Sequence, residues 1–331
     1  MSIQHILELL DSHAAGDEER LLSVALMAAA AEARAGRPED AKALKAAVQK
    51  VRDHGGGGGG VTPIPLARPR GELQAIVASS YPKLGLSAMV LAPAVSARLE
   101  RIVRQQTERA LLRGHGQKPA THLLLVGPPG TGKTMTSAAL AGELHLPLFT
   151  VKLESLFSRY LGETAAKLRL LFDQIAQTRG VYLLDEFDAI GARRGDPNDV
   201  GEMRRVLNSV LAFMEEPNST DSLVIAATNH VESLDRALAR RFDEVVEYGL
   251  PSAAEARALL AARLKKYKVS AKSLAPLDPV LEGLSQAEID RAAAAAIKEA
   301  ILEGDAHVSV DVLEALLRER RDVREHFQSR L

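Results

Sequence analysis

One eight-residue stretch constrains this chain more than any other, because it has the form G-x-x-x-x-G-K-[ST]. It reads Gly127, Pro128, Pro129, Gly130, Thr131, Gly132, Lys133 and Thr134. The apolar run 121–126 before it predicts a buried strand, and the Ala- and Leu-rich run 135–144 after it predicts a helix. A strand, a glycine-rich turn and a helix in this order are the context that a phosphate-binding loop requires. The stretch therefore predicts that a nucleoside triphosphate binds here.

The residue types in this loop indicate how ATP and Mg²⁺ would be held. Its glycines allow successive backbone N–H groups to face the phosphates, at the positive end of the following helix. Lys133 is expected to contact the β- and γ-phosphates, and the Thr134 hydroxyl is expected to bind Mg²⁺. Met135, the next residue, completes the predicted nucleotide contacts.

A second pattern, about fifty residues later, predicts hydrolysis as well as binding. The apolar run 181–184 ends in two adjacent acids, Asp185 and Glu186. A carboxylate at the end of a buried strand can hold Mg²⁺ through its water shell, which we assign to Asp185. Glu186 is then expected to orient and deprotonate the water that attacks the γ-phosphate. The alternative is a pair of surface acids that merely ends a strand.

Composition bounds the remaining classes of function. The chain has 331 residues, enough for two or three domains, and it contains no cysteine, which excludes disulfides and cysteine nucleophiles. Its 42 basic and 43 acidic residues nearly balance, so nucleic acid is a disfavoured partner. No apolar run reaches the roughly 18 residues of a membrane span, and the N-terminus has no signal pattern. We therefore expect a cytoplasmic protein without a membrane span.

Glycine, proline and the apolar periodicity divide the chain into four parts. Residues 1–54 have three amphipathic helical patterns and predict a small N-terminal helical bundle, either a docking module or an oligomerisation element. Residues 55–87 begin with six consecutive glycines and predict a Gly/Pro-rich linker. Residues 88–250 alternate strand and helix patterns, and residues 251–331 predict a C-terminal helical lid domain.

The predicted fold is α/β: a five-stranded parallel sheet of the P-loop NTPase type with helices on both faces. Its expected strands are 121–126, 148–153, 181–184, 223–227 and 245–248. Beyond residue 250 the apolar pattern has a helical period, which predicts helices over 253–266, 286–302 and 310–321.

Further motifs in the same order resemble the AAA clade of the AAA+ ATPases, over about residues 88–320. The run 223–229 is similar to the strand that ends in the sensor-one residue, so the resemblance implies that Asn229 orients the attacking water. The run 234–243 is similar to the segment whose two arginines complete the ATP site of a neighbouring subunit, here Arg240 and Arg241. These two arginines are adjacent, because the Pro-Gly spacer usual in that clade is missing. Ser285 stands where other AAA+ branches have a sensor-two arginine.

The resemblance also implies a ring, most commonly a hexamer, and a substrate class. Residues 156–164 are similar to the first pore loop of AAA proteins that thread polypeptides, with Tyr160, Leu161 and Gly162 as the substrate-contacting residues. An aromatic ring can grip an extended polypeptide of almost any sequence through apolar contact. The alternative is that Tyr160 is a packed core aromatic at the start of a helix. The basic pair at 193–194 resembles the second pore loop.

Two classes of function follow. The first is an ATP-driven protein remodeller or unfoldase acting on polypeptide clients. Within this class the chain resembles small bacterial AAA ATPases encoded beside a subtilisin-like serine protease in plasmid-maintenance or phage-defence pairs, which implies such a protease as a partner. The alternative is a DNA-directed AAA+ ATPase, a loader or a transposition helper, although the basic insert or winged helix usual in those proteins does not occur here.

Overall fold

The computed structural model describes most of the chain beyond residue 70. The described ranges are 71–156, 161–190, 208–230, 240–267, 273–305 and 307–328, with isolated positions at 24, 25, 28, 29, 42, 46, 69, 206 and 269. The chain divides into two compact units, Met1–Thr62 and Pro63–Leu331. In the first unit, Val24, Ala25, Ala28 and Ala29 are helical and buried. Lys42 and Ala46 are helical and exposed, and the other residues of the expected N-terminal bundle lie outside the described ones.

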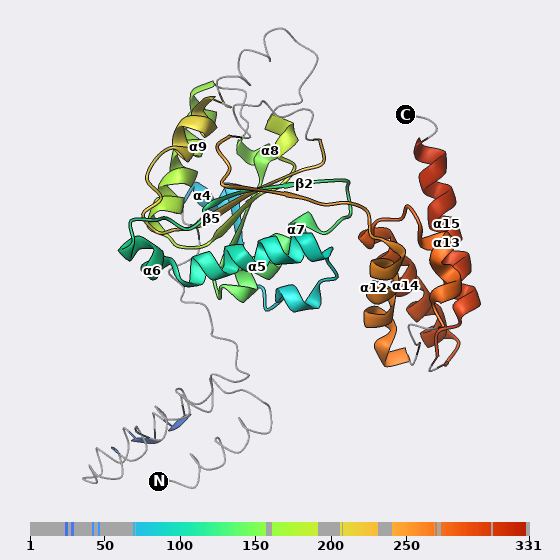
Figure 1. The fold of residues 1–331 in the computed structure, drawn as a ribbon. Coiled ribbons are helices and arrows are strands. Elements are labelled where there is room, and N and C mark those ends of the chain that lie inside the picture. The colour runs from blue at the N-terminus through green and yellow to red at the C-terminus, as the bar shows by residue number, and fades with distance from the viewer. Residues whose placement is uncertain are drawn as a thin grey trace. The chain divides into compact units, whose positions relative to one another are not determined.

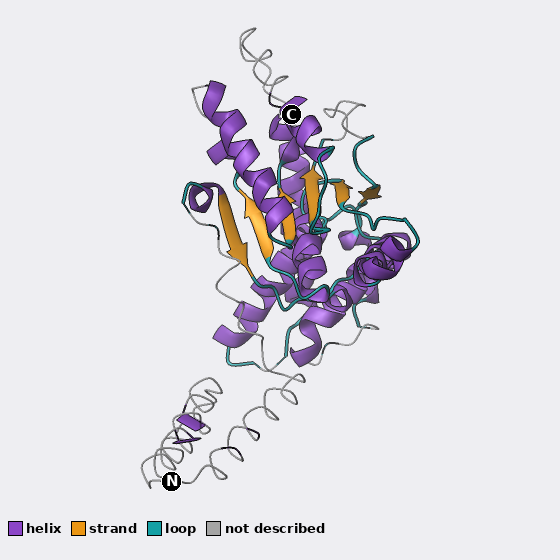
Figure 2. Ribbon diagram, turned by 90° about the vertical axis from the view of Figure 1, so that its left-hand side faces the viewer, coloured by secondary structure: helices purple, strands orange, loops and turns teal. Residues whose placement is uncertain are grey.

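A six-stranded sheet forms the centre of the second unit (Figures 1 and 2). Its strands, in the spatial order β1-β3-β4-β5-β2-β6, are β1 (Val77–Ser80), β3 (Leu148–Val151), β4 (Val181–Leu184), β5 (Leu223–Thr228), β2 (His122–Val126) and β6 (Glu244–Glu247). β2 pairs in parallel with β5 on one side and β6 on the other, and β5 pairs in parallel with β4. The three strands β4, β5 and β2 are therefore neighbours, and their carboxyl ends lie at one edge of the sheet.

The expectation of a five-stranded parallel sheet is wrong by one strand. β1 pairs antiparallel with β3, with Val77 opposite Val151, and it lies at the edge of the sheet, where Figure 2 shows a strand pointing the opposite way. It falls within the region 55–87 that we expected to be a linker. Its sequence, Val-Ala-Ser-Ser, buries only Val77. A strand this short and polar has no recognisable apolar pattern in the sequence. It can be identified as a strand only from its pairing with β3 in the structure.

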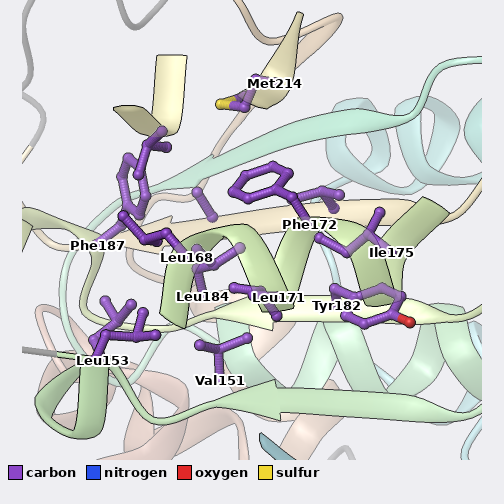
Figure 3. Close-up of a cluster of buried hydrophobic side chains, with 14 of the residues drawn as sticks. Val151, Leu153, Leu168, Leu171, Phe172, Ile175, Tyr182, Leu184, Phe187 and Met214 are labelled. Atoms are coloured by element: carbon purple, nitrogen blue, oxygen red, sulfur yellow. The ribbon is translucent and has the colours of Figure 1, made fainter. Parts of the chain in front are cut away.

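Helices cover both faces of the sheet, as the apolar runs predicted. α5 (Pro93–Thr107) and α7 (Lys133–Glu143) pack with Leu123 and Leu125 on one face. On the other face, α9 (Leu161–Gln177) packs against β4, and Figure 3 shows its apolar side chains over Tyr182 and Leu184. Because both faces are buried, β2, β4 and β5 are buried along their whole length, and their sequences are continuous apolar runs.

Short elements complete this region. They are α4 (Leu73–Ile76), α6 (Arg109–Gly114), α8 (Leu153–Leu156) and the 3₁₀ turns η2 (Leu86–Ala88) and η3 (Phe187–Ile190). The expected strand 148–153 is shorter than predicted, because Leu153 opens α8. Within the described part of the chain, no helix has the length and hydropathy of a membrane-spanning segment.

The C-terminal part is helical, as expected (Figure 1). It has its own apolar core. Its elements are α12 (Ala253–Leu264), η5 (Lys265–Tyr267), η6 (Ala275–Leu277), α13 (Asp278–Leu281), α14 (Gln286–Leu302) and α15 (Val310–Gln328). Both α12 and α14 begin with a capping box, Ser252 with Glu255 and Ser285 with Glu288. In each box the serine oxygen accepts the N3 amide and the glutamate accepts the N-cap amide, which fixes where the helix starts.

Candidate nucleotide-binding site

The predicted phosphate loop lies at the carboxyl edge of the sheet, between the end of β2 and the start of α7. Ligands of open parallel sheets bind at this edge, outside the carboxyl ends of the strands. Asn229 follows β5, which pairs with β2, and Asp185 follows β4, which pairs with β5. The sheet order therefore brings together three sequence segments that are about fifty residues apart.

Two glycines of the loop are required by their surroundings. Gly127 has φ 149°, and a Cβ there would lie 2.3 Å from the Tyr248 carbonyl oxygen. Gly130 has φ 78°, and a Cβ there would lie 2.8 Å from Ser285 Oγ. L-residues with side chains rarely adopt such φ values, so any side chain would strain the loop. The loop conformation thus depends on glycine for two reasons, backbone angle and close packing.

Lys133 is buried inside the loop. Its Nζ donates hydrogen bonds to the carbonyl oxygens of Gly127 (2.7 Å) and Pro128 (2.8 Å), and the residue is 7% exposed. Burial lowers the pKa of this ammonium group, whereas the nearby carboxylates of Asp185 and Asp188 raise it. A cation confined in the loop by its own carbonyls has the position and charge to contact bound phosphates.

Thr134 and Asp185, the two predicted magnesium ligands, are in direct contact. The Thr134 hydroxyl donates a 2.7 Å hydrogen bond to Asp185 Oδ2. Oxygen ligands of this kind fit Mg²⁺, which keeps several waters and binds substrate phosphates together with one or two protein ligands. Within the described ranges, no group of three or more His, Asp or Glu side chains could hold a metal alone. The donor set therefore fits a magnesium ion that arrives with its nucleotide.

Glu186, the predicted base, has a strained backbone. It lies directly after β4 and has φ 52°, which is uncommon for a residue with a side chain. Its amide donates a 3.0 Å hydrogen bond to Asp185 Oδ1. Its side chain is exposed. Strain of this kind persists where the surroundings fix it, and it is concentrated at functional sites.

A polar contact joins the ends of β4 and β5. The Thr228 hydroxyl donates a 2.9 Å hydrogen bond to Asp188 Oδ1 and accepts one from the His230 amide (3.0 Å). Thr228 is buried, and Asn229 next to it is exposed. This contact fixes the predicted sensor residue relative to the acidic strand end. Our sequence analysis did not identify Asp188 or Thr228, although each lies within two residues of an assigned site residue.

The C-terminal helical part contacts the phosphate loop. The Ala287 amide, in the first turn of α14, donates a 3.0 Å hydrogen bond to the Gly130 carbonyl oxygen. Ser285, the N-cap of α14, is buried beside the same glycine. The sequence analysis noted Ser285 only because other AAA+ branches have a sensor-two arginine at this position. The structure shows the consequence, because a large side chain has no room between α14 and the loop.

Arg240 and Arg241 are not at this site. Both are exposed and precede β6, and Asp243, two residues beyond Arg241, joins the segment to the opposite edge of the sheet. There the Asp243 carboxylate accepts hydrogen bonds from the amides of Thr121 (2.8 Å) and His122 (2.9 Å), at the start of β2. The phosphate loop follows the end of β2, five residues or about 16 Å along the strand.

The pore residues fall partly outside the described ranges. Tyr160 lies outside them, as does the basic pair at 193–194. Leu161 and Gly162 form the backbone start of α9. Their proposed contact with a polypeptide therefore stays a prediction from the sequence.

The fold and the site define a P-loop nucleoside triphosphatase domain. Residues 123–250 match the family model described as "ATPase family associated with various cellular activities (AAA)". The chain thus contains an AAA ATPase domain, and its match covers the sheet from β2 to β6 together with the phosphate loop.

Curated relatives share this domain. An "Uncharacterized AAA family ATPase y4kL" of Sinorhizobium fredii is 44% identical over 192 residues, 58% of each chain. A "Proteasome-activating nucleotidase" of Saccharolobus islandicus is 36% identical over 214 residues, 62% of this chain and 54% of the relative. The "ATP-dependent zinc metalloprotease FtsH 3" of Sphaerobacter thermophilus is 35% identical over 195 residues, 58% of this chain and 40% of the relative. The chain spans little more than half the length of the first two.

Proposed function

We propose that this protein hydrolyses ATP to ADP and phosphate with the help of Mg²⁺. The observation that carries the proposal is the contact between Thr134 and Asp185, with Glu186 as the next residue. A magnesium ligand pair and a carboxylate base are thus adjacent at the edge where the phosphate loop lies. The AAA ATPase relatives support the same activity.

Each residue has a distinct role in this reaction. The loop amides and Lys133 would hold the phosphates, and Thr134 and Asp185 would hold a magnesium ion, which would supply positive charge to neutralise the phosphates. Glu186 accepts a proton from the attacking water, so that the water oxygen attacks the γ-phosphorus and ADP leaves. Asn229 helps to orient that water. Met135 is proposed as a further contact of the nucleotide.

The catalytic unit is proposed to be a ring of subunits, in which Arg240 and Arg241 serve the neighbouring ATP site. Support comes from Asp243, two residues beyond Arg241, which is bound at the edge of the sheet opposite to the phosphate loop of the same chain. A guanidinium near the γ-phosphate spreads the charge of the transition state. A hexamer is the stoichiometry that the resemblance implies.

The proposed substrate is a polypeptide that the ring threads or unfolds. Supporting this, the region 156–164 resembles a pore loop, and two relatives carry names that connect them with proteolysis, the proteasome-activating nucleotidase and the zinc metalloprotease. A subtilisin-like serine protease, encoded beside this chain in a defence or plasmid-maintenance pair, is the partner that the resemblance suggests. Residues 1–54, which we expect to form a helical bundle, would recruit the client.

Stimulation of ATP hydrolysis tests the substrate class. A permanently unfolded polypeptide, such as reduced and carboxymethylated lactalbumin, should raise phosphate release, and single-stranded DNA should not. Tyr160→Ala should retain basal hydrolysis and lose this stimulation, because only the apolar grip is removed. Tyr160→Phe, the matched control, should keep it. Stimulation by DNA alone would replace the threading proposal with the DNA-directed alternative.

A further inference from the structure

The segment that carries the two adjacent arginines is anchored immediately after them. Phe242 is buried, and its ring meets that of Phe187 edge to face with centroids 6.3 Å apart. The Asp243 carboxylate binds the backbone at the start of β2 through Thr121 and His122. Because Phe242 and Asp243 are fixed, the directions available to Arg240 and Arg241 are restricted.

The two arginines have different surroundings. Arg241 forms an ion pair through Nη1 with the Glu215 carboxylate of its own chain. Glu215 directly follows the helical residues 208–214, so this pair joins the arginine segment to a second element. Arg240 has no hydrogen bond or ion pair with any residue that the structure describes. Its guanidinium is exposed and keeps its full donor capacity.

We infer that the two arginines divide their role: Arg240 reaches the neighbouring subunit's ATP, and Arg241 is a positioning residue that Glu215 holds. This inference rests on the proposed ATPase ring. The physical reason is that the Glu215 carboxylate and a phosphate would compete for the Arg241 guanidinium. A phosphate that recruited Arg241 would have to displace the Glu215 carboxylate, whereas Arg240 offers five unengaged donors.

The Arg241–Glu215 pair has little to do with stability. Arg241 is 46% exposed and Glu215 is 50% exposed at the side chain, and ion pairs this exposed contribute little to the free energy of unfolding. Its effect is geometric, because it fixes the backbone that carries Arg240. Loss of the pair is therefore expected to lower the rate of hydrolysis with no change in thermal stability or ATP affinity.

The chain offers a matched control one residue away. Glu216 forms an ion pair of similar exposure with Arg169 (2.6 Å), which also pairs with Asp173 and stacks on Phe213. This second pair does not involve the arginine segment. Glu215→Ala should lower kcat about tenfold with KM unchanged, because a small misplacement of a catalytic group is costly. Glu216→Ala should stay within about twofold of wild type in kcat.

A charge exchange separates positioning from direct catalysis. Arg241→Glu and Glu215→Arg alone should each lose about tenfold in kcat, and the double variant should recover most of it because the pair is restored in reverse. Arg240→Ala should lose about 10³-fold, and no change at position 215 should rescue it. Analytical ultracentrifugation and ATP-analogue binding are recorded for each variant, so that assembly and affinity are compared directly.

Specific outcomes would overturn the inference. It fails if Arg241→Ala is as damaging as Arg240→Ala and the double exchange does not recover activity, because Arg241 would then contact the phosphates itself. It also fails if Glu215→Ala is indistinguishable from wild type or from Glu216→Ala. The proposed function fails in a different way, when wild-type protein releases no more phosphate than Lys133→Ala, or when Arg240→Ala hydrolyses ATP at the wild-type rate.

Discussion

The Thr134 hydroxyl donates a 2.7 Å hydrogen bond to Asp185 Oδ2, across 51 positions of sequence. Thr134 lies beyond the end of β2, after the phosphate loop, and Asp185 directly follows β4. In the sheet, β5 lies between these two strands. The phosphate loop and the acidic end of β4 are separate motifs in the sequence. The contact between Thr134 and Asp185 brings their oxygen atoms together into one candidate magnesium site.

This contact predicts how magnesium dependence responds to mutation. Thr134→Ala should raise the Mg²⁺ concentration for half-maximal phosphate release about tenfold, because one of the ion's oxygen ligands is removed. Thr134→Ser keeps the hydroxyl and should titrate like wild type. Phosphate release measured against total Mg²⁺ at fixed ATP gives the comparison. Equal midpoints for the alanine and serine variants would remove Thr134 from the metal site.

Glu186→Gln should bind ATP with near wild-type affinity and lose hydrolysis by about 10²-fold or more, since the amide keeps the shape of the side chain and cannot accept the proton. Binding of a fluorescent ATP analogue and release of phosphate measure the two effects separately. Lys133→Ala is the contrasting variant, because it should lose the affinity itself. Retention of more than about a tenth of wild-type turnover by Glu186→Gln would show that another group acts as base.

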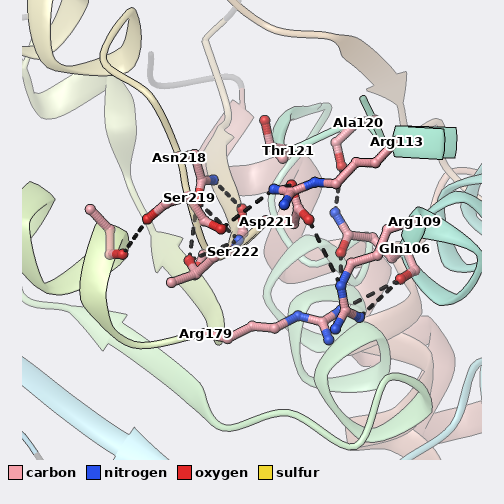
Figure 4. A network of polar contacts seen from close by, with 12 residues as sticks. Gln106, Arg109, Arg113, Ala120, Thr121, Arg179, Asn218, Ser219, Asp221 and Ser222 are labelled. Atoms are coloured by element: carbon pink, nitrogen blue, oxygen red, sulfur yellow. Dashed lines mark hydrogen bonds and ion pairs between the residues drawn. The ribbon is translucent and has the colours of Figure 1, made fainter. Parts of the chain in front are cut away.

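A polar network around Asp221 lies at the amino-terminal edge of the sheet, away from the nucleotide site. Breaking it should lower the free energy of unfolding. Asp221, with its side chain 5% exposed, forms ion pairs with Arg113 (2.8 Å) and Arg109 (3.8 Å), as Figure 4 shows. It also has φ 54°. Asp221→Ala should lower the free energy of unfolding by about 2 kcal/mol, because the ion pairs are lost and alanine disfavours this φ.

Asp221→Asn separates those two causes. Asparagine tolerates positive φ, so this variant should lose the ion pairs alone and be less destabilised than alanine. Glu108→Ala, which removes an exposed i,i+4 pair with Arg104, is the control and should change stability by less than about 0.5 kcal/mol. Urea unfolding followed by circular dichroism measures all three. An alanine variant as stable as the control would mean that the network contributes nothing.

The Asp243 carboxylate predicts a specific acid dependence of stability. Burial raises its pKa, but the nearby His122 imidazole, with Nδ1 3.8 Å from Oδ2, and hydrogen bonds from the amides of Thr121 and His122 outweigh this and hold the pKa at about 2. A pKa lowered on folding stabilises the protein above the unfolded value of about 3.9, and that stabilisation is lost as the pH falls towards 2.

Asp243→Asn removes this titration. Wild type should therefore be more stable than the variant at pH 7, and the difference should shrink between about pH 4 and pH 2. Urea midpoints measured across this range, with Asp305→Asn as an exposed control, give the comparison. A difference that stays constant with pH would contradict the assigned hydrogen bonds.

Much of the fold could be predicted from the sequence, because β2, β4 and β5 are buried on both faces and are therefore continuous apolar runs. The phosphate loop was recognisable because fixed glycines and a lysine stand at fixed spacing. β1 was not, since four residues with one buried side chain form no pattern, and it is stabilised by pairing with β3. The ends of β3 and β6 moved by one or two residues, because turn and cap contacts set them.

The site shows the same limit. Asp185 and Glu186 could be predicted because they follow a strand directly. The Thr228–Asp188 contact and the Arg241–Glu215 pair could not, since each joins segments that only the folded sheet brings together. The close approach of α14 to Gly130 was likewise invisible, although the S-x-x-E pattern at Ser285 marks where that helix begins.

The central claim is that each ATP site is built from two chains, and mixing subunits tests it most directly. Wild-type protein at fixed concentration is mixed with increasing amounts of an Arg240→Ala/Glu186→Gln double variant, whose own sites are inactive, and phosphate release is measured per wild-type subunit. We predict that this rate falls as the variant is added, because wild-type sites next to a variant subunit receive no arginine. A rate per wild-type subunit that stays constant at equal stoichiometry, while sizing shows mixed rings, would contradict the account.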